Sequence, residues 1–469
     1  MPPIAVRAER SFWPWACLGL AGSVLVALTG PRLAGGPVRW WFDPSLGGVG
    51  VALFYSGIVA LSVAWLALGR LAIPTRELRI VGAAWCAPLL VTAPLFSQDA
   101  YSYLAQGTLV HLGIDPYRHA PAVLAQAGQA HVLGAVDPFW RHTTAPYGPL
   151  FLGIVSLIVA VAGSHLVLGV LLIRLVDVGG LVLLAAFAPR LARALGADPD
   201  RATWWVLLSP LVLLELVAGT HNDLLMIGLL VAGVTFAIER RVLVGIGLCV
   251  LAATIKLPAA AAIPFILVAC ADRRTWFRGV MLAAGLVLAV SVITGLGLGW
   301  ISSNVFSTPD KVRLAITPAT ALGWTVAQVV PVGARSLESA LGVVAFGLSL
   351  VFGALLLWRT RRGNMVRNLG IALIAVAVCG PAAWPWYLTW GLVLLAACPG
   401  IQQSRALALA VVACALVVKA DGILTFPLHT APVFVVLYLG ATAVWLSRTR
   451  LSEAAVRRRV RTRALVESR

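Results

Sequence analysis

Long apolar runs separated by short arginine-rich segments constrain this chain more than any other feature of its sequence. The runs are about 15–22 residues long, close to the roughly 20 residues that a helix needs to cross a bilayer. The 469 residues are 60% hydrophobic and only 12% charged, which is far more apolar sequence than a soluble core requires. In lipid, a helix satisfies its own backbone polar groups segment by segment. The sequence therefore predicts a polytopic, all-α transmembrane helical bundle.

The apolar runs predict about fourteen membrane spans, with a large external loop after the third. In chain order the predicted spans are 12–30, 48–69, 79–96, 166–188, 203–219, 222–238, 242–256, 258–271, 279–299, 338–358, 366–382, 384–398, 404–420 and 431–447.

Arginine placement orients these spans. With the N-terminus in the cytoplasm, 26 of the 36 basic residues fall in inside loops and in the C-terminal tail, as the positive-inside rule requires. The segment 147–163 is apolar enough to be a further span, but counting it would place the later arginine clusters outside. We therefore expect it to be a juxtamembrane or re-entrant helix on the outer side. Both termini are then cytoplasmic, and the long external segments are 97–165 and 300–337.

Composition argues against several functional classes. The net charge of +18 would suit a nucleic-acid partner, but the basic residues punctuate the spans instead of clustering on a soluble domain. The seven cysteines lie in or beside apolar runs and have no metal-ligand or disulfide spacing. There is no glycine-rich phosphate loop or nucleophile elbow. We predict no cofactor, and a requirement for a divalent metal stays open.

An acid stands where one apolar run ends, in the stretch LFSQDAYSYLAQG at 95–107. If 98–110 is helical, helical spacing places four side chains on one face: Asp99, Ser102, Tyr103 and Gln106. Aspartate is also a favoured helix N-cap. Capping and a functional role are compatible, and both are kept as interpretations of Asp99.

Two further polar interruptions lie at the same predicted membrane face. In LVAGTHNDLLMIG, the residues His221, Asn222 and Asp223 form a tight external hairpin, whose side chains either make a turn and cap or line a site. In AATIKLPAAAAIPF, Lys256 interrupts two short apolar runs. A lysine within a span costs roughly 2.5–3.5 kcal/mol at mid-bilayer. It either snorkels to the interface or binds a phosphate.

Aromatic and loop residues have simpler interpretations. Trp386 and Tyr387, in GPAAWPWYLTW, suit an aromatic belt at the membrane interface, although such rings also stack on sugars. Arg118 and His119, in DPYRHAPAV, suit a solvated external loop.

Two ion pairs are predicted from spacing. Arg174 and Asp177 stand three residues apart within one span, where pairing would offset part of the desolvation cost of each charge. Lys419 and Asp421 stand at an external span end and are expected to pair there.

Several of these motifs recur together in one known family. The order FSQDAYSYLAQGTLVHLGIDPY, YGPL, HNDLLMIGLL, IKLP and PWYLTW resembles the polyprenol-phosphate-sugar-dependent glycosyltransferases of the GT-C superfamily. The similarity is greatest to the actinobacterial α-(1→6)-mannosyltransferases that build the mannan core of lipomannan and lipoarabinomannan. The resemblance implies a GT-C transmembrane module at 1–299, a variable C-terminal transmembrane module at 300–447 and a basic cytoplasmic tail at 448–469. The tail suits anionic lipid headgroups.

The resemblance also implies roles for individual residues. An acid at the start of the first large external loop is the family's catalytic base, and Asp99 occupies that place. Many GT-C enzymes have paired acids in this loop, whereas here Asp99 stands alone, which disfavours a metal-dependent mechanism. The candidate substrate-binding residues are Tyr103, Gln106, Arg118, His119, Tyr147, His221, Asn222, Asp223, Lys256, Trp386 and Tyr387.

The implied reaction needs only one carboxylate. An inverting transfer requires a base to take the proton of the attacking hydroxyl, whereas a polyprenyl phosphate leaves as a stabilised anion without a general acid. Lys256, with Arg118 or His119, would stabilise that anion. The donor is then polyprenyl-phosphate mannose, and the acceptor is a lipid-linked mannan or glycolipid outside the plasma membrane.

A transporter or flippase of a lipid-linked sugar is the alternative function. Transporters often contain repeated halves with broken helices at corresponding positions. We find no such repeat, and the polar groups lie near one membrane face instead of at mid-depth.

Overall fold

The computed structural model describes residues 4–36, 38–40, 47–302, 313–331, 333–380 and 382–442. Regular secondary structure in these ranges is helical throughout, and their one β contact is an isolated antiparallel bridge between Val418 and Leu424. The all-α prediction is confirmed over this part of the chain. The predicted basic tail at 448–469 lies outside the described residues.

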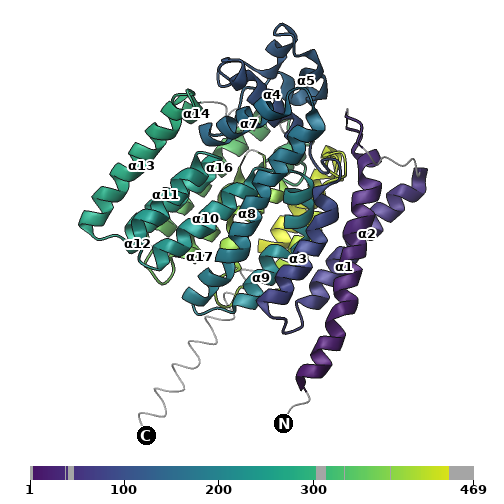
Figure 1. Ribbon diagram of the computed structural model, residues 1–469, viewed down its shortest axis with the longest axis vertical. Helices are drawn as coiled ribbons and strands as arrows, with labels where there is room; N and C mark the ends of the chain where they lie inside the picture. Colours follow the sequence, from purple (N-terminus) through teal and green to yellow (C-terminus); the bar gives the residue numbers. More distant parts are fainter. Residues whose placement is uncertain are drawn as a thin grey trace.

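The first half of the chain folds into helices that run along the bundle and a group of short helices at one end (Figure 1). Their bounds are α1 Ile4–Ala34, α2 Gly47–Leu68, α3 Thr75–Leu90, α4 Asp99–His111, η1 Pro121–Ala125, α5 Ala130–Ala135, α6 Pro138–Arg141, α7 Pro149–Ala162, α8 Leu166–Ala194, α9 Pro199–Leu207, η2 Leu211–Ala218 and α10 Asp223–Ile238.

The second half adds further helices to the bundle. Their bounds are α11 Val242–Ala253, η3 Leu257–Ala261, α12 Ala262–Cys270, α13 Arg273–Ile293, α14 Gly299–Ser302, α15 Pro318–Ala327, α16 Ala334–Trp358, α17 Met365–Cys379, η5 Pro385–Leu388, α18 Thr389–Leu395, α19 Arg405–Ala415 and η6 Leu428–Thr430.

Among the described residues, five helices are long and apolar enough to cross a membrane. They are Phe12–Ala34 of α1 and the whole of α2, α8, α13 and α16. A sixth forms if α9 and η2, which are bent by 47° at their junction, count as one span. Many of the other predicted spans coincide with apolar helices of 10–17 residues, so the number fourteen stays a prediction.

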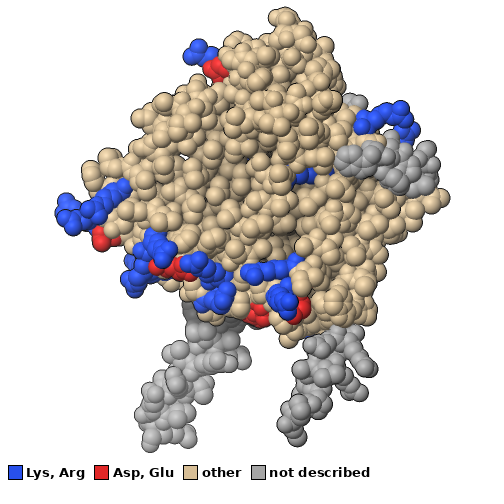
Figure 2. Space-filling view, viewed as in Figure 1, with Lys and Arg blue, Asp and Glu red and all other residues tan. Residues whose placement is uncertain are grey.

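Arginine side chains join several helix ends at one edge of the bundle. Arg201 donates to the carbonyl of Gly69, which joins the start of α9 to the end of α2. Arg190 pairs with Glu239, which joins the ends of α8 and α10, and Arg362 donates to the last carbonyl of α10. Figure 2 shows Lys and Arg side chains gathered along this lower edge of the molecule.

The opposite end is closed by a cap of short helices that includes α4, α5 and α7 (Figure 1). The fourteen residues of α7 are too few to cross a bilayer, and α7 packs mainly against α4. The sequence predicts α4 as an interfacial helix with one polar face, but it is buried from Ala100 to Leu109. Its polar side chains therefore face the protein interior.

Candidate active site

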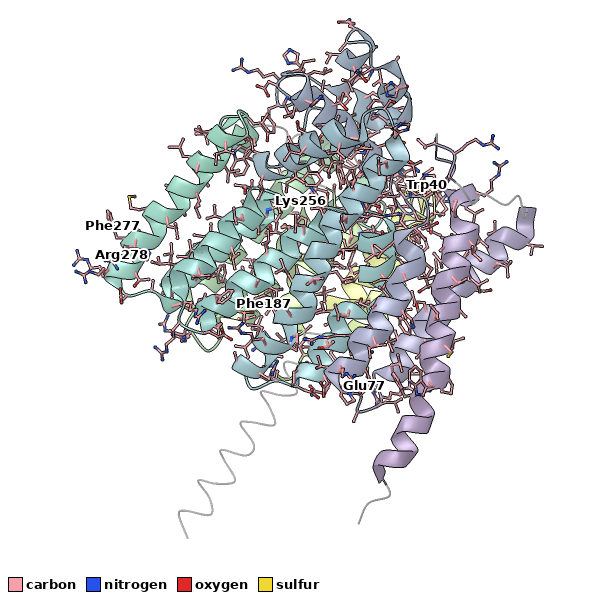
Figure 3. All side chains as sticks on the ribbon, in the orientation of Figure 1. Trp40, Glu77, Phe187, Lys256, Phe277 and Arg278 are labelled. Atoms are coloured by element: carbon pink, nitrogen blue, oxygen red, sulfur yellow. The ribbon has the colours of Figure 1, made fainter. Side chains whose placement is uncertain are left out.

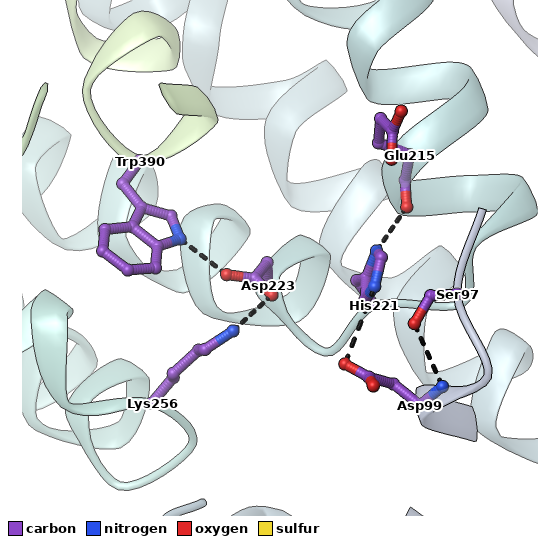
Figure 4. A network of polar contacts seen from close by, with 7 residues as sticks. All are labelled: Ser97, Asp99, Glu215, His221, Asp223, Lys256 and Trp390. Atoms are coloured by element: carbon purple, nitrogen blue, oxygen red, sulfur yellow. Dashed lines mark hydrogen bonds and ion pairs between the residues drawn. The ribbon is translucent and has the colours of Figure 1, made fainter. Parts of the chain in front are cut away.

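Asp99 is the first residue of α4, where the group of short helices meets the bundle. Its carboxylate makes no helix-capping hydrogen bond. The N-cap position belongs to Gln98, and no side chain caps this helix end. Ser97 Oγ instead accepts a hydrogen bond of 3.0 Å from the backbone N–H of Asp99. The capping interpretation of Asp99 is therefore wrong. The carboxylate, with 15% of its side chain exposed, is left to interact with residues from other helices (Figure 4).

His221 faces the acid from the turn between η2 and α10. Its Nε2 lies 3.8 Å from Asp99 Oδ2, while Nδ1 lies 2.5 Å from the carbonyl oxygen of Glu215. Because a carbonyl only accepts, Nδ1 carries a proton, and the neutral ring presents the lone pair of Nε2 to Asp99. The imidazole also stacks on Trp386, with ring centroids 4.3 Å apart. Both contacts fix the ring in its orientation toward the acid.

A second charged group, the pair of Lys256 and Asp223, lies beside these residues. Lys256 Nζ lies 2.7 Å from Asp223 Oδ2, and the indole N–H of Trp390 donates to Asp223 Oδ1 at 2.5 Å. The ammonium also sits over the Tyr387 ring, 4.7 Å from its centroid. Asp223 makes no side-chain cap at the start of α10. The prediction that the Asp223 side chain caps a helix is therefore wrong, as it is for Asp99.

Two fully buried amides have unused hydrogen-bonding capacity. Among the described residues, neither amide atom of Asn222 has a hydrogen-bond partner, and neither does Oε1 of Gln106. Leaving a buried polar group unpaired costs about 1–3 kcal/mol. Asn222 stands between His221 and Asp223 in the chain, so this open capacity suits the hydroxyl groups of a sugar.

Burial and neighbouring charges set the protonation of the acid. Burial raises the pKa of Asp99, and the repulsion of Asp223 adds to this increase, while His221 and Lys256 lower it. Burial lowers the pKa of His221. Raising the acid and lowering the base brings the two groups toward sharing one proton. A carboxylate whose pKa is raised in this way is better suited to accept a proton near neutral pH than an exposed aspartate is.

The YGPL and IKLP segments meet at this site. The backbone N–H of Gly148 donates to the carbonyl of Ile255 at 3.0 Å, immediately before Lys256. A Cβ at Gly148 would lie 2.1 Å from the carbonyl oxygen of Thr254, so only glycine allows this approach. The ring of Tyr147 packs edge-on against Tyr103 of α4, with centroids 4.9 Å apart.

Left-handed backbone precedes both His221 and the Asp99 segment. Phe96 has φ of 65° and Thr220 has φ of 58°. Such conformations cost non-glycine residues of order 1–3 kcal/mol each and cluster at functional sites. The two segments, one before Asp99 and one before His221, are joined by a hydrogen bond of 3.0 Å from the N–H of Leu95 to the carbonyl of Ala218.

Arg174 of α8 holds these two segments together from within the bundle. Its guanidinium donates to Thr220 Oγ1 at 2.9 Å and to the carbonyl of Ala218 at 3.1 Å on one side. On the other side it donates to the carbonyls of Leu90, at 2.9 Å, and Thr92.

The predicted pair of Arg174 with Asp177 is wrong, because within the described part of the chain the buried Asp177 carboxylate has no hydrogen-bond partner. Lys419 and Asp421 do pair, at 3.8 Å.

Arg118 and His119 are not brought to Asp99 by any contact that we find. Arg118 Nε lies 3.5 Å from Asp115 Oδ2, with 84% of its side chain exposed. His119 Nδ1 contacts the backbone carbonyl of Asp115 at 3.2 Å. In the described residues, no group of three or more His, Cys, Asp or Glu side chains could hold a metal ion.

Two functional contacts were missed from the sequence. Trp390, which binds Asp223, stands four residues after Trp386 in PWYLTW, and this one-turn spacing was a usable signal. The clamp made by Arg174 had no such signal, because its partners are backbone carbonyls and one hydroxyl, that of Thr220, which lies 46 residues away in the sequence.

The fold and site define a membrane-embedded helical protein with a buried acid, an imidazole and an ion pair at one end of its bundle. Residues 16–272 match the profile of the alpha-(1->6)-mannopyranosyltransferase N-terminal domain, and residues 316–449 match the MptB C-terminal domain. The chain therefore belongs to the alpha-(1->6)-mannopyranosyltransferase family.

Curated relatives carry the same family name. Alpha-(1->6)-mannopyranosyltransferase A of Mycobacterium tuberculosis is 35% identical over 431 residues, which cover 84% of this chain and 81% of the relative. Alpha-(1->6)-mannopyranosyltransferase A of Corynebacterium glutamicum is 28% identical, over 72% of this chain and 77% of the relative. No solved structure matches the chain.

Proposed function

We propose that this protein transfers mannose from polyprenyl-phosphate mannose to an external lipid-linked mannan or glycolipid, forms an α-(1→6) linkage and inverts the anomeric carbon. The names of its relatives support mannosyl transfer. The observation that carries the mechanism is the position of Asp99. Its carboxylate caps no helix, lies 3.8 Å from His221 Nε2 and has its pKa raised by burial.

In the proposed reaction, a hydroxyl of the acceptor mannose attacks the anomeric carbon of the donor. Asp99 takes the hydroxyl proton as the new C–O bond forms. The bond between the anomeric carbon and the phosphate oxygen breaks at the same time, and its electron pair leaves with the polyprenyl phosphate. A β-linked mannosyl phosphate thus becomes an α-mannoside.

The surrounding residues supply charge and orientation. Lys256 offers the departing phosphate an ammonium that is held in place by Asp223, which stabilises the anion as it forms. His221, with Nδ1 fixed by the Glu215 carbonyl, accepts a proton from Asp99 through Nε2. Trp386 is buried and stacks on both His221 and Trp384, with centroids 4.3 and 4.7 Å apart, so Trp384 is the ring of this stack that would offer an aromatic face to a sugar.

The topology belongs to the same proposal. A GT-C type bundle of about fourteen spans, divided near residue 300, would place both termini in the cytoplasm and the capped end outside the plasma membrane. The basic side chains at the opposite edge of the bundle support this orientation (Figure 2). The donor's lipid tail would then lie in the bilayer while its sugar phosphate reaches Asp99.

The test uses purified full-length protein, synthetic polyprenyl-phosphate mannose and a short α-(1→6)-mannoside, with and without a chelator. We expect Asp99→Asn to fold normally and to lose about 10²–10⁴ in kcat, and NMR of the wild-type product to show an α-(1→6) linkage. Asp115→Asn, which changes an acid of the exposed loop, is the control. Full turnover by Asp99→Asn would refute the role of the acid.

A further inference from the structure

A groove between α1 and α3 stands apart from the site built around Asp99. We call it the α1–α3 groove, and it consists of two adjacent cavities whose walls share Trp40 and Ala93. The first is a cavity of about 240 Å³ at the capped end of the bundle, where Arg32, Arg39 and Tyr101 contribute to its wall. The second is a smaller cavity of about 100 Å³ that continues along α1 and α3.

The larger cavity is cationic and the smaller one is apolar, which matches the charged head and the apolar tail of a phosphate-bearing lipid. Arg32 and Arg39 bring positive charge to the larger cavity, and guanidinium groups suit phosphate oxygens. The smaller cavity is lined by aliphatic side chains such as Val24, Leu28 and Val91, which are exposed on the bundle surface. A cationic head at the end of the bundle with an apolar continuation along two helices fits a phosphate-bearing lipid.

The groove lies on the opposite side of the α4 start from the catalytic acid. Successive helix residues are about 100° apart, so Asp99 and Tyr101 project from nearly opposite sides of the first turn. Asp99 faces His221, whereas the Tyr101 hydroxyl accepts a hydrogen bond of 3.0 Å from Trp40 Nε1 in the groove wall. In Figure 3, Trp40 and Lys256 lie toward the same end of the molecule, far from Glu77 at the other edge.

This placement separates the two lipid substrates. In the donor, the phosphate oxygen is bonded directly to the reacting carbon, so the donor phosphate must lie at Asp99. A phosphate in the α1–α3 groove is on the other side of α4 and belongs to a lipid in which sugars separate the phosphate from the reacting hydroxyl. Resting on the proposed function, we infer that the α1–α3 groove binds the phosphate-bearing lipid that anchors the acceptor glycan.

The test compares two acceptors with the full-length protein in nanodiscs of neutral phosphatidylcholine. One acceptor is α-(1→6)-mannotetraose joined through a phosphodiester to dioleoylglycerol, and the other is the soluble methyl glycoside of the same tetraose. Arg39→Gln should raise KM for the phospholipid acceptor about tenfold, the effect of one lost charge-assisted hydrogen bond, relative to KM for the soluble acceptor. Leu28→Trp, which fills the apolar part, should act in the same direction. The matched control is Arg278→Gln, an exposed arginine of α13.

Three outcomes would overturn the inference: an unchanged ratio of the two KM values, an equal rise in both, or a rise in KM for the donor. Binding of the phospholipid acceptor to the Asp99→Asn protein gives a readout that needs no turnover. Arg39→Gln should weaken this binding about tenfold as well. If the wild-type protein transfers no mannose but binds this lipid through Arg39, the proposed function fails while the groove stands.

Discussion

Replacing Arg174 tests whether the two segments of the site depend on one clamp. Arg174→Met removes the donors to the carbonyls of Leu90 and Thr92. It also removes the donors to Thr220 and Ala218, although the Ala218 carbonyl keeps its bond from Leu95. The buried Thr92 carbonyl left without its donor costs about 1–3 kcal/mol, and the part-buried Leu90 carbonyl adds up to a similar amount, or about 2–6 kcal/mol as an upper range for the two. This is a large part of the 5–15 kcal/mol that stabilises a typical native protein.

Activity should respond more steeply than stability, because Arg174 holds the segments that precede Asp99 and His221. A shift of about 1 Å in catalytic groups can cost roughly 10² in rate. We expect Arg174→Met to lower kcat about 100-fold below its melting temperature, with a smaller change in KM for the donor. Arg174→Lys keeps the charge and some donors, so it should recover part of the loss.

A matched control lies in the same helix. Arg190 pairs with Glu239 at the other end of α8, and 41% of its side chain is exposed, so Arg190→Met should cost about 0–1 kcal/mol. The assays are thermal unfolding in detergent and steady-state kinetics with synthetic donor. Wild-type kcat in Arg174→Met, or equal losses in Arg174→Met and Arg190→Met, would refute the clamp.

The remaining predictions concern protonation and the residues around the acid. Because burial raises the pKa of Asp99, kcat/KM should fall on acidification at a pH above about 3.9, where an exposed aspartate is still ionised. Lys256 lowers this pKa and Asp223 raises it, so Lys256→Met should move the acidic limb of the pH profile to higher pH and Asp223→Asn to lower pH. Identical limbs in both variants would contradict this electrostatic assignment. The native state holds the Asp99 proton more tightly than the unfolded chain, so stability from this group falls as pH rises through its raised pKa. Asp99→Asn should therefore melt at a higher temperature than the wild type at pH 7, with the difference vanishing below pH about 3.9. A lower melting temperature for Asp99→Asn at pH 7 would count against a strained, buried carboxylate. Trp390→Phe removes the indole donor to Asp223 and should cost about 1–3 kcal/mol in thermal unfolding, whereas wild-type stability would show that this bond is dispensable.

Hydrophobic periodicity and charge placement predicted the helices of the fold more accurately than the contacts of the site. The apolar runs predicted α2, α8 and α16 with nearly correct bounds, because an unbroken apolar helix needs no tertiary information. The span predicted at 203–219 instead breaks between α9 and η2. Ser209 and Pro210 lie within this break, between Leu207 and Leu211, and a proline disfavours helix at the residue before it.

The sequence predicted some residues of the site but not all of their contacts, for a physical reason. Asp99, His221 and Lys256 are conspicuous because polar groups are costly in apolar surroundings, and the structure brings these three together. What the sequence could not specify is which charges pair. Arg174 donates hydrogen bonds to backbone carbonyls and does not pair with Asp177, which stands three residues away. A guanidinium has five N–H donors, and several fixed acceptors can bind more of them than one carboxylate can.

The two neighbouring acids, Asp99 and Asp223, differ in how completely their charges are paired. Asp223 is neutralised by Lys256 and held by Trp390, so its structural pairing is complete. Asp99 has weaker partners among the described residues: His221 Nε2 approaches it at 3.8 Å, and Ser97 and Lys256 lower its pKa without offsetting the effect of burial. Burial therefore raises the pKa of Asp99, because its charge is only partly compensated by its neighbours. This difference supports the proposed role of Asp99 as the base and of Asp223 as the support of Lys256, and it adds a geometric reason to the one that the family resemblance gave for Asp99.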